Sequence, residues 1–266
     1  DFCLSRGLGD VYKRQEYKEP LRESIAGINH MGWLLELEDA DGNDLYPEIR
    51  ERAIAILESG KTDHHDLVRY EYIRRLGYYC TESSEHNAEY NNFFIKAKYP
   101  ELIERYNIPL DEYPRRCINQ IENWKKDREK YMHDDVTHTR TTEYASYIME
   151  AIVTDIPYKI GGNVINNGLI PNLPAEACVE VACLVNKNGI QPCAQKPLPL
   201  QLAAMNSAMI GVQLLTIEAA VTQKKETIYQ AAMLDPHTSS ELSIDEIIRL
   251  CDDLIEAHGS YLPKYH

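Results

Sequence analysis

The 266-residue sequence lacks several patterns that would assign a function at once. Its 13 glycines never fall as GxGxxG, the turn that receives a dinucleotide pyrophosphate at a helix N-terminus. Its seven cysteines form no CxxC pair, which favours free thiols in a reducing cytoplasm over a disulfide framework or a zinc site. No apolar run approaches the roughly 20 residues that cross a bilayer, and no signal peptide is evident, so we expect no membrane partner.

Positive charge is also scarce. The chain has 28 Lys and Arg residues against 42 Asp and Glu residues, a formal net charge of −14. Such a surface repels phosphate backbones, so we expect no nucleic-acid partner. The apolar content of 44% is ordinary for a globular protein and provides for a sizeable core.

The N-terminal part of the sequence predicts a strand followed by two helices. Apolar residues alternate over residues 28–37, which is typical of a strand, and the polar turn DADGND follows. Pro47 suits the start of a helix that Gly60 ends. A second helix is predicted over about residues 65–76, with Gly77 as its stop.

The middle of the sequence changes from helix to strand. Pro114 favours the start of a helix, in which apolar residues up to Trp124 fall at helical spacing. Thr141 or Thr142 is expected to cap the next helix. Between residues 157 and 197, short β-prone runs alternate with Asn, Gly and Pro clusters, which predicts strands or long ordered loops.

Helix is predicted again over residues 200–223, which are rich in Ala, Leu and Met. The last helix has a clear start, because Ser243 and Glu246 have the spacing of a capping box, and Gly259 marks its end. There is no internal repeat and no low-complexity linker. We therefore predict one α-rich, mixed α/β domain.

Several motifs together resemble the C-terminal part of glycoside hydrolase family 4, in its α-galactosidase-like branch. The likeness extends over nearly everything from residue 16 onward, which is far more than one short motif. The motifs are GINHM (27–31), GYYCTESSEHNAEY (77–90), THTRTTEYAS (137–146), NVINNGLIPNLPAEACVEV (163–181), PLPLQLAAMN (197–206) and QAAMLDPHTSSELSIDEI (230–247).

The resemblance implies a division of the chain. Residues 1–15, DFCLSRGLGDVYKRQ, look like translated adaptor sequence, with a flexible native arm as the alternative, and are excluded from fold reasoning. Residues 16–266 are expected to form the family's C-terminal catalytic and metal-binding domain. This domain is similar to the C-terminal domain of lactate and malate dehydrogenases, here without its N-terminal Rossmann domain.

The resemblance also implies an unusual reaction, since family 4 departs from the two-carboxylate scheme of glycoside cleavage. In this family NAD oxidises the sugar 3-hydroxyl, a base removes the acidified carbon-2 proton, and the aglycone is eliminated. Water addition and re-reduction complete the cycle. A divalent cation, Mn²⁺ in this branch, stabilises the enediolate as a Lewis acid. The NAD site is expected largely in the missing N-terminal domain.

Three residues match family functions, and a fourth, Asn29, is a neighbour placed to orient the site or touch substrate. His30 in GINHM matches the metal-binding histidine, and its neighbour Asn29 either touches substrate or serves the turn. Tyr90 matches the catalytic tyrosine, which needs a metal or a nearby cation to favour its phenolate. Arg140 matches a substrate-binding arginine, with a surface salt bridge as the alternative.

Other polar groups receive structural roles. Glu82, Ser83, Glu85 and His86 bring polar groups together before Tyr90, and a helix-capping network explains them as well as site roles do. The HDDVTH segment (133–138) has metal-like spacing, but an acidic turn needs no metal. The family's cysteine ligand lies upstream of His30 and outside this chain, so we expect weaker metal binding than in a complete enzyme.

Three readings of function follow. The first is the C-terminal part of an NAD- and manganese-dependent α-glycosidase, acting on a small α-glycoside and homo-oligomeric when complete. The second is a relative of 2-hydroxyacid dehydrogenases, and the third is a non-catalytic oligomerisation or sugar-binding module. No basic cluster serves a sugar 6-phosphate, which favours unphosphorylated substrates. The third reading requires a self-sufficient apolar surface, whereas the first predicts exposed apolar residues.

Overall fold

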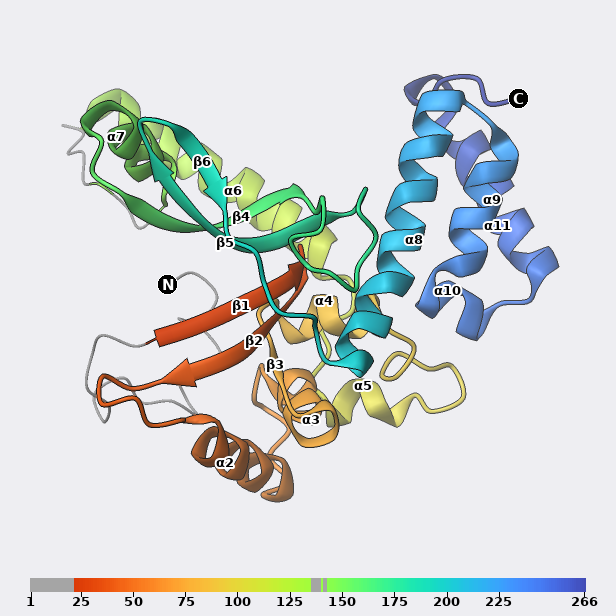
Figure 1. The fold of residues 1–266 in the computed structure, drawn as a ribbon. Coiled ribbons are helices and arrows are strands. Elements are labelled where there is room, and N and C mark those ends of the chain that lie inside the picture. The colour runs from red at the N-terminus through yellow and green to blue at the C-terminus, as the bar shows by residue number, and fades with distance from the viewer. Residues whose placement is uncertain (1–21, 135–139, 141–142) are drawn as a thin grey trace.

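The structure is a computed structural model that describes residues 22–134, 140 and 143–266. The adaptor-like segment 1–15 and the proposed caps Thr141 and Thr142 lie outside the described residues. Within the described part, a six-stranded antiparallel sheet has the strand order β3–β2–β1–β5–β4, and β6 pairs with β5 (Figure 1). The strands are β1 (Arg22–Ile28), β2 (Met31–Glu38), β3 (Tyr79–Cys80), β4 (Tyr158–Ile165), β5 (Cys178–Asn186) and β6 (Gly189–Pro192).

Helices surround this sheet and make up most of the C-terminal part of the chain (Figure 1). The prediction of an α-rich, mixed α/β fold is confirmed. The helices are α2 (Tyr46–Glu58), α3 (Leu67–Leu76), α4 (Ser84–Glu89), α5 (Glu101–Arg105), α6 (Glu112–His133), α7 (Ala145–Thr154), α8 (Leu200–Thr222), α9 (Lys225–Leu234), α10 (Pro236–Glu241) and α11 (Ile244–His258), followed by the 3₁₀ turn η2 (Gly259–Tyr261).

The first predicted strand is part of a hairpin. Ile28 ends β1, and β2 begins at Met31 after a two-residue turn, so the prediction of one strand from residue 28 was wrong at its start. Strict alternation also fails, because Trp33 and Leu34 are both fully buried. Trp33 packs in the main core and Leu34 packs in a second cluster with α2 and α3. The strand is therefore covered on both faces, which removes the polar side of the pattern.

The predictions for the next two helices are confirmed. Pro47 lies in the first turn of α2, and Gly60 follows its end with a φ of 70°. Gly77 ends α3 in the left-handed conformation, with a φ of 89°. These turn glycines do what their sequence positions predict, because a glycine adopts positive φ without steric cost.

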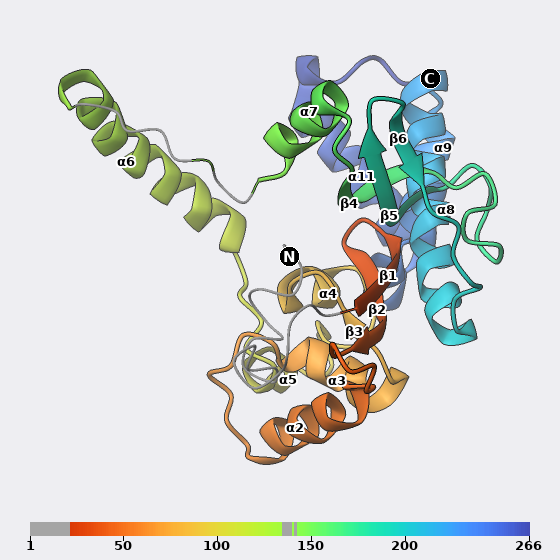
Figure 2. The ribbon, with the colours of Figure 1, turned by 60° about the vertical axis from the view of Figure 1, so that its left-hand side comes forward.

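Helix α6 begins two residues before Pro114, and it extends away from the rest of the chain (Figure 2). Its apolar stripe is exposed, with Ile118, Ile121 and Trp124 at 58%, 58% and 61% of their full accessible surface. Helical spacing therefore predicted the helix correctly, although this stripe does not pack in the described core. Helix α7 begins after Tyr144, whose side chain forms no capping hydrogen bond.

Helix α8 corrects the expectation that no segment is long and apolar enough to span a bilayer. By length and composition alone, its 23 residues meet that test. The sequence analysis looked for an unbroken apolar run, and it missed α8 because polar residues such as Asn206 interrupt the helix. Asn206 is fully buried and hydrogen-bonded to Trp33 and Met31, so this part of α8 is anchored in the protein core.

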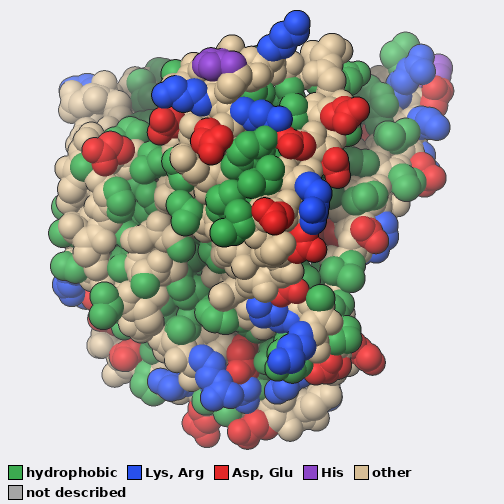
Figure 3. Space-filling view, turned by 90° about the vertical axis from the view of Figure 1, so that its right-hand side faces the viewer, with side chains coloured by type: hydrophobic (Ala, Val, Ile, Leu, Met, Phe, Trp, Pro, Cys, Tyr) green, Lys and Arg blue, Asp and Glu red, His purple; other side chains and the backbone are tan. Residues whose placement is uncertain are grey.

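The C-terminal predictions are confirmed in detail. Ser243 and Glu246 form a capping box at the start of α11, and Gly259 follows its end. The six described cysteines form no disulfide, as the spacing predicted. The face that includes the C-terminal helices exposes hydrophobic side chains among charged ones (Figure 3). Exposed apolar residues on these helices include Ile217, Val221, Leu234, Ile244 and Leu254.

Candidate metal centre and active site

His30 occupies the second position of the turn between β1 and β2, with a φ of 64°. Glycine or asparagine is favoured there, because a left-handed conformation costs most other residues about 1 kcal/mol. A histidine held in this conformation directs its imidazole from the hairpin tip into a partly exposed position. Strain of this kind concentrates at functional sites, and here it supports the predicted metal role of His30.

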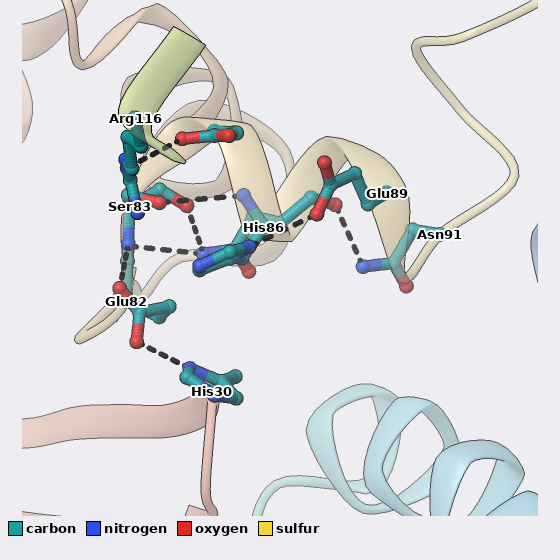
Figure 4. Close-up of polar contacts among 9 residues, drawn as sticks. His30, Glu82, Ser83, His86, Glu89, Asn91 and Arg116 are labelled. Carbon is teal, nitrogen blue, oxygen red and sulfur yellow. Dashed lines mark hydrogen bonds and ion pairs between the residues drawn. The ribbon is translucent and has the colours of Figure 1, made fainter. Parts of the chain in front are cut away.

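The TESSEH segment folds into the start of the short helix α4. Ser83 is its N-cap, and its hydroxyl accepts a hydrogen bond from the His86 amide. The side-chain amide of Asn87 donates to the carbonyls of Glu82 and Ser83, which fixes the entry into the helix. Local capping therefore places the side chains of Glu82 and His86 on the side that faces His30 (Figure 4).

Three side chains form a candidate cation site. His30, Glu82 and His86 each offer a ligand atom, and these atoms all lie within 4.8 Å of one another. A first-row divalent cation about 2 Å from each donor fits this spacing, and two imidazoles with one carboxylate suit Mn²⁺ or a similar ion. The residues present therefore fit the metal that the sequence predicted, and they offer more than the single ligand expected.

His30 and Glu82 contact each other inside this cluster. His30 Nδ1 donates to Glu82 Oε2, because a carboxylate can only accept. The other oxygen of Glu82 accepts from the Ser83 amide at 2.7 Å. Burial raises the pKa of the Glu82 carboxyl, but the Ser83 amide and the two histidines outweigh it and hold that pKa below its usual value. This contact orients the His30 ring and keeps Glu82 beside it in the ligand cluster.

Tyr90 ends α4 and lies beside both histidines. Its ring centroid is 5.9 Å from that of His30 and 6.1 Å from that of His86. Burial, followed by the charges of Glu89 and Glu82, raises the pKa of the Tyr90 phenol. The phenol therefore stays protonated near neutral pH unless positive charge is added, which is what the sequence argument required of a catalytic tyrosine.

Two other predicted residues are placed differently. Arg140 lies next to α7, where Nε donates to Ser146 at 3.0 Å, Nη1 donates to Glu150 at 2.5 Å, and the guanidinium stacks 3.5 Å from the Tyr147 ring centroid. These contacts join Arg140 to the surface of α7, and its substrate-binding role stays a prediction. Asn29 is exposed in the hairpin turn, and its role also stays a prediction.

Three further polar residues have structural or exposed positions in the described part of the chain. Asp235 caps α10 by accepting from the Thr238 amide at 2.7 Å, so LDPHT begins a helix. Asn166 is fully buried and bonds to the backbone at Ile170 and Leu173, which holds the signature loop. His133 is exposed at the end of α6, while most of HDDVTH lies outside the described residues.

Sequence reasoning missed the site roles of Glu82 and His86. Both were noticed within TESSEH, but a capping network explained them equally well. The structure shows the capping by Ser83, and it also gathers the side chains of Glu82 and His86 beside His30 as possible ligands. Glu180 on β5 was missed entirely, although it also faces the cluster. Burial and the nearby Glu82 raise the pKa of its carboxyl, and His30 opposes them.

Asn206 on α8 fixes the hairpin that carries His30. Its Oδ1 accepts from the Trp33 indole at 2.7 Å, and its Nδ2 donates to the Met31 carbonyl at 2.9 Å. Asn206→Ala leaves both buried groups without these partners, so we expect about 2 kcal/mol less unfolding free energy in urea melts. Asn119→Ala, at an exposed position on α6, is the control and should stay within about 0.5 kcal/mol of the parent chain. Equal stability of the two variants would contradict this role.

Comparison with known proteins gives concordant matches. The family profile described as the family 4 glycosyl hydrolase C-terminal domain matches residues 25–238. An α-galactosidase of Bacillus subtilis is 59% identical over 92% of this chain and 56% of its own length. An α-galactosidase of Rhizobium meliloti is 28% identical over 90% of this chain and 50% of its own length.

A solved structure shares the fold. It is a 6-phospho-α-glucosidase from gut microorganisms, in complex with NAD and Mn²⁺, with a TM-score of 0.72 and 18% sequence identity. The match covers 97% of this chain and 60% of that protein. The chain thus spans about half the length of the curated relatives it matches.

Proposed function

The chain belongs to the family 4 glycosyl hydrolases, and from that premise we propose that it is the C-terminal part of an NAD- and divalent-metal-dependent α-glycosidase acting on α-galactosides. One observation carries the proposal. His30, Glu82 and His86 gather their ligand atoms within 4.8 Å, and Tyr90 stands beside both histidines. A cation site next to a phenol is the combination that proton removal from a sugar carbon requires.

The residues of this chain have distinct roles in the proposal. A divalent cation bound there would act as a Lewis acid on the sugar oxygens and would help to acidify the carbon-2 proton once carbon 3 is oxidised. His30, Glu82 and His86 would hold the cation as its protein donors. Tyr90 then accepts the carbon-bound proton, since the added positive charge offsets the burial and the acidic neighbours that raise its pKa.

NAD does not fit the described residues. The strands in the described part pair only antiparallel, so they form no parallel-strand crevice, and the sequence offers no glycine-rich strand-to-helix turn for a pyrophosphate. We assign no step of the chemistry to NAD contacts here. In the proposal NAD is held by residues that do not belong to this chain.

The substrate proposal rests on similarity and on charge. Identity of 59% to an α-galactosidase over most of this chain supports an α-galactoside. Among the described residues, the side chains assigned to the candidate site are His30, Glu82, His86 and Tyr90, with Glu180 nearby, and none of these is a permanent cation that would bind a sugar 6-phosphate. We therefore propose a small unphosphorylated α-galactoside in the cytoplasm. A homo-oligomeric complete enzyme stays a prediction.

A chimera tests the function directly. The chimera joins the N-terminal half of the Bacillus subtilis α-galactosidase ahead of this chain. This chain then replaces the C-terminal half of that enzyme, which it matches. We expect cleavage of p-nitrophenyl α-galactoside that requires both NAD and Mn²⁺ and that EDTA abolishes. The corresponding α-glucoside, its 6-phosphate and a 2-hydroxyacid serve as competing substrates. Oxidation of the 2-hydroxyacid without glycoside cleavage, or a folded chimera that turns over none of them, would contradict the proposal.

A further inference from the structure

Glu180 crosses a row of small residues to reach the metal centre. It pairs with Gly27 on β1, and Gly27 in turn pairs with Gly32 on β2. The Glu180 carboxyl lies 3.6 Å from where a Cβ on Gly32 would be, and its Oε1 lies 3.7 Å from the corresponding point on Gly161. A glutamate side chain can lie across a neighbouring strand in this way only because that strand presents no side chain.

Neighbouring atoms leave no room for a side chain at Gly27 or Gly32, which form this lane of glycines. A Cβ on Gly27 would lie 2.4 Å from the Met31 carbonyl oxygen, and one on Gly32 would lie 2.8 Å from Thr81 Oγ1. Both positions therefore disfavour a side chain, and the Glu180 carboxyl occupies the space beside Gly32. On β5 the residues on either side of Glu180, Val179 and Val181, are buried in the core. Glu180 thus projects from the opposite, partly open face toward the site.

The position of the carboxyl is unfavourable without a ligand. Within the described part of the chain, its charge interactions are with Glu82, which is repulsive, and with His30. No described side chain or amide donates a hydrogen bond to it. A partly buried carboxylate beside a second carboxylate costs free energy that a protein retains only when something else compensates. A cation at His30 and Glu82 would supply that compensation.

Distance decides how Glu180 would interact with the cation. The ligand atoms of His30, Glu82 and His86 all lie within 4.8 Å of one another, and the Glu180 carboxylate does not belong to that set. Its charge interacts with two members of that set, His30 and Glu82. A cation held by three protein donors retains water in its other positions. Those waters are the donors within reach of a carboxylate just outside the first coordination sphere.

We propose that Glu180 accepts a hydrogen bond from a water ligand of the divalent cation held at His30, and so positions that cation without binding it directly. This inference rests on the proposed function, because it assumes the His30 cation site. Outer partners of this kind change metal affinity about 10–100-fold when they are removed. Glu180 is thus a positioning residue whose effect should appear in metal binding by this chain alone.

The test is direct Mn²⁺ binding, with free Mn²⁺ measured by its electron paramagnetic resonance signal. The variants are Glu180→Gln, Glu180→Asp and His30→Ala, and the control is Glu176→Gln, which removes one negative charge from an exposed position near the start of β5. We expect Glu180→Gln to weaken Mn²⁺ binding about tenfold. Glu180→Asp should also weaken it, because the shorter side chain keeps the charge but cannot cross the lane of glycines. Glu176→Gln should bind like the parent chain.

Thermal melting separates this role from a purely structural one. Without metal, Glu180→Gln should melt at the same temperature as the parent chain or higher, since it removes repulsion from Glu82. A structural residue would lower the melting temperature together with the affinity. Unchanged Mn²⁺ affinity in Glu180→Gln, or full affinity in Glu180→Asp, overturns the role of Glu180 alone. If the parent chain binds no Mn²⁺, or if His30→Ala binds it equally well, the proposed metal site fails as well.

Discussion

Replacing His30 with asparagine is expected to remove Mn²⁺ binding while leaving the chain as stable as before. The φ of 64° at His30 is a conformation that asparagine adopts more readily than histidine. The substitution therefore relieves backbone strain as it removes the imidazole. Loss of a direct ligand should lower Mn²⁺ affinity at least about 100-fold, beyond the effect of an outer partner. Titration followed by electron paramagnetic resonance measures the affinity, and urea melts measure the stability.

Two controls sharpen the His30 experiment. His133→Asn changes an exposed histidine in the HDDVTH segment, which we reject as a metal site, and it should leave Mn²⁺ binding unchanged. His30→Ala should lose Mn²⁺ binding as well, but it should also lose stability, because alanine is strained at positive φ. Full Mn²⁺ affinity in His30→Asn would show that the cation is held elsewhere. A clear loss of stability in that variant would show that the contact of His30 with Glu82 stabilises the fold more than the relief of strain in the turn does.

The sequence predicted those elements whose ends are set by local chemistry. Gly77 ended α3, and Ser243 with Glu246 began α11, because these signals act within one helical turn. The β1–β2 hairpin escaped prediction for the same reason. Its turn has His30 where a glycine would have marked it, so the alternating apolar pattern ran on without a visible break. His30 hides the turn in the sequence pattern, and it is also the residue proposed to bind the cation.

The candidate site was predicted only in part, because long-range contacts assemble it. His30 and Glu82 are 52 positions apart, and the strand pairing that places Glu180 beside them joins residues about 150 positions apart. No local pattern encodes such proximity. The resemblance identified His30 and Tyr90, which the structure brings together, whereas Arg140 contacts α7 residues instead. A motif match assigns a role but not a position.

Tyr90→Phe tests the chemistry itself and is expected to have the largest effect. In the chimera, removal of the phenol oxygen should lower kcat about 1,000-fold, within the range for loss of a general base. Exchange of the sugar carbon-2 proton with deuterated water should be lost in parallel, because the same oxygen accepts that proton. Mn²⁺ binding should stay unchanged, since His30, Glu82 and His86 gather three ligand atoms without the phenol.

Tyr99→Phe is the matched control, because Tyr99 is 46% exposed and was assigned no role in the site. It should retain full activity and full proton exchange. The pattern that would refute a base role for Tyr90 is equally specific: kcat within tenfold of the parent enzyme, with proton exchange intact. Loss of activity together with loss of Mn²⁺ binding would instead make the phenol a support for the cation. The two outcomes can be told apart because the Tyr90 ring lies 5.9 Å from the His30 ring, beside the metal ligands. The three-ligand cluster is complete without the phenol.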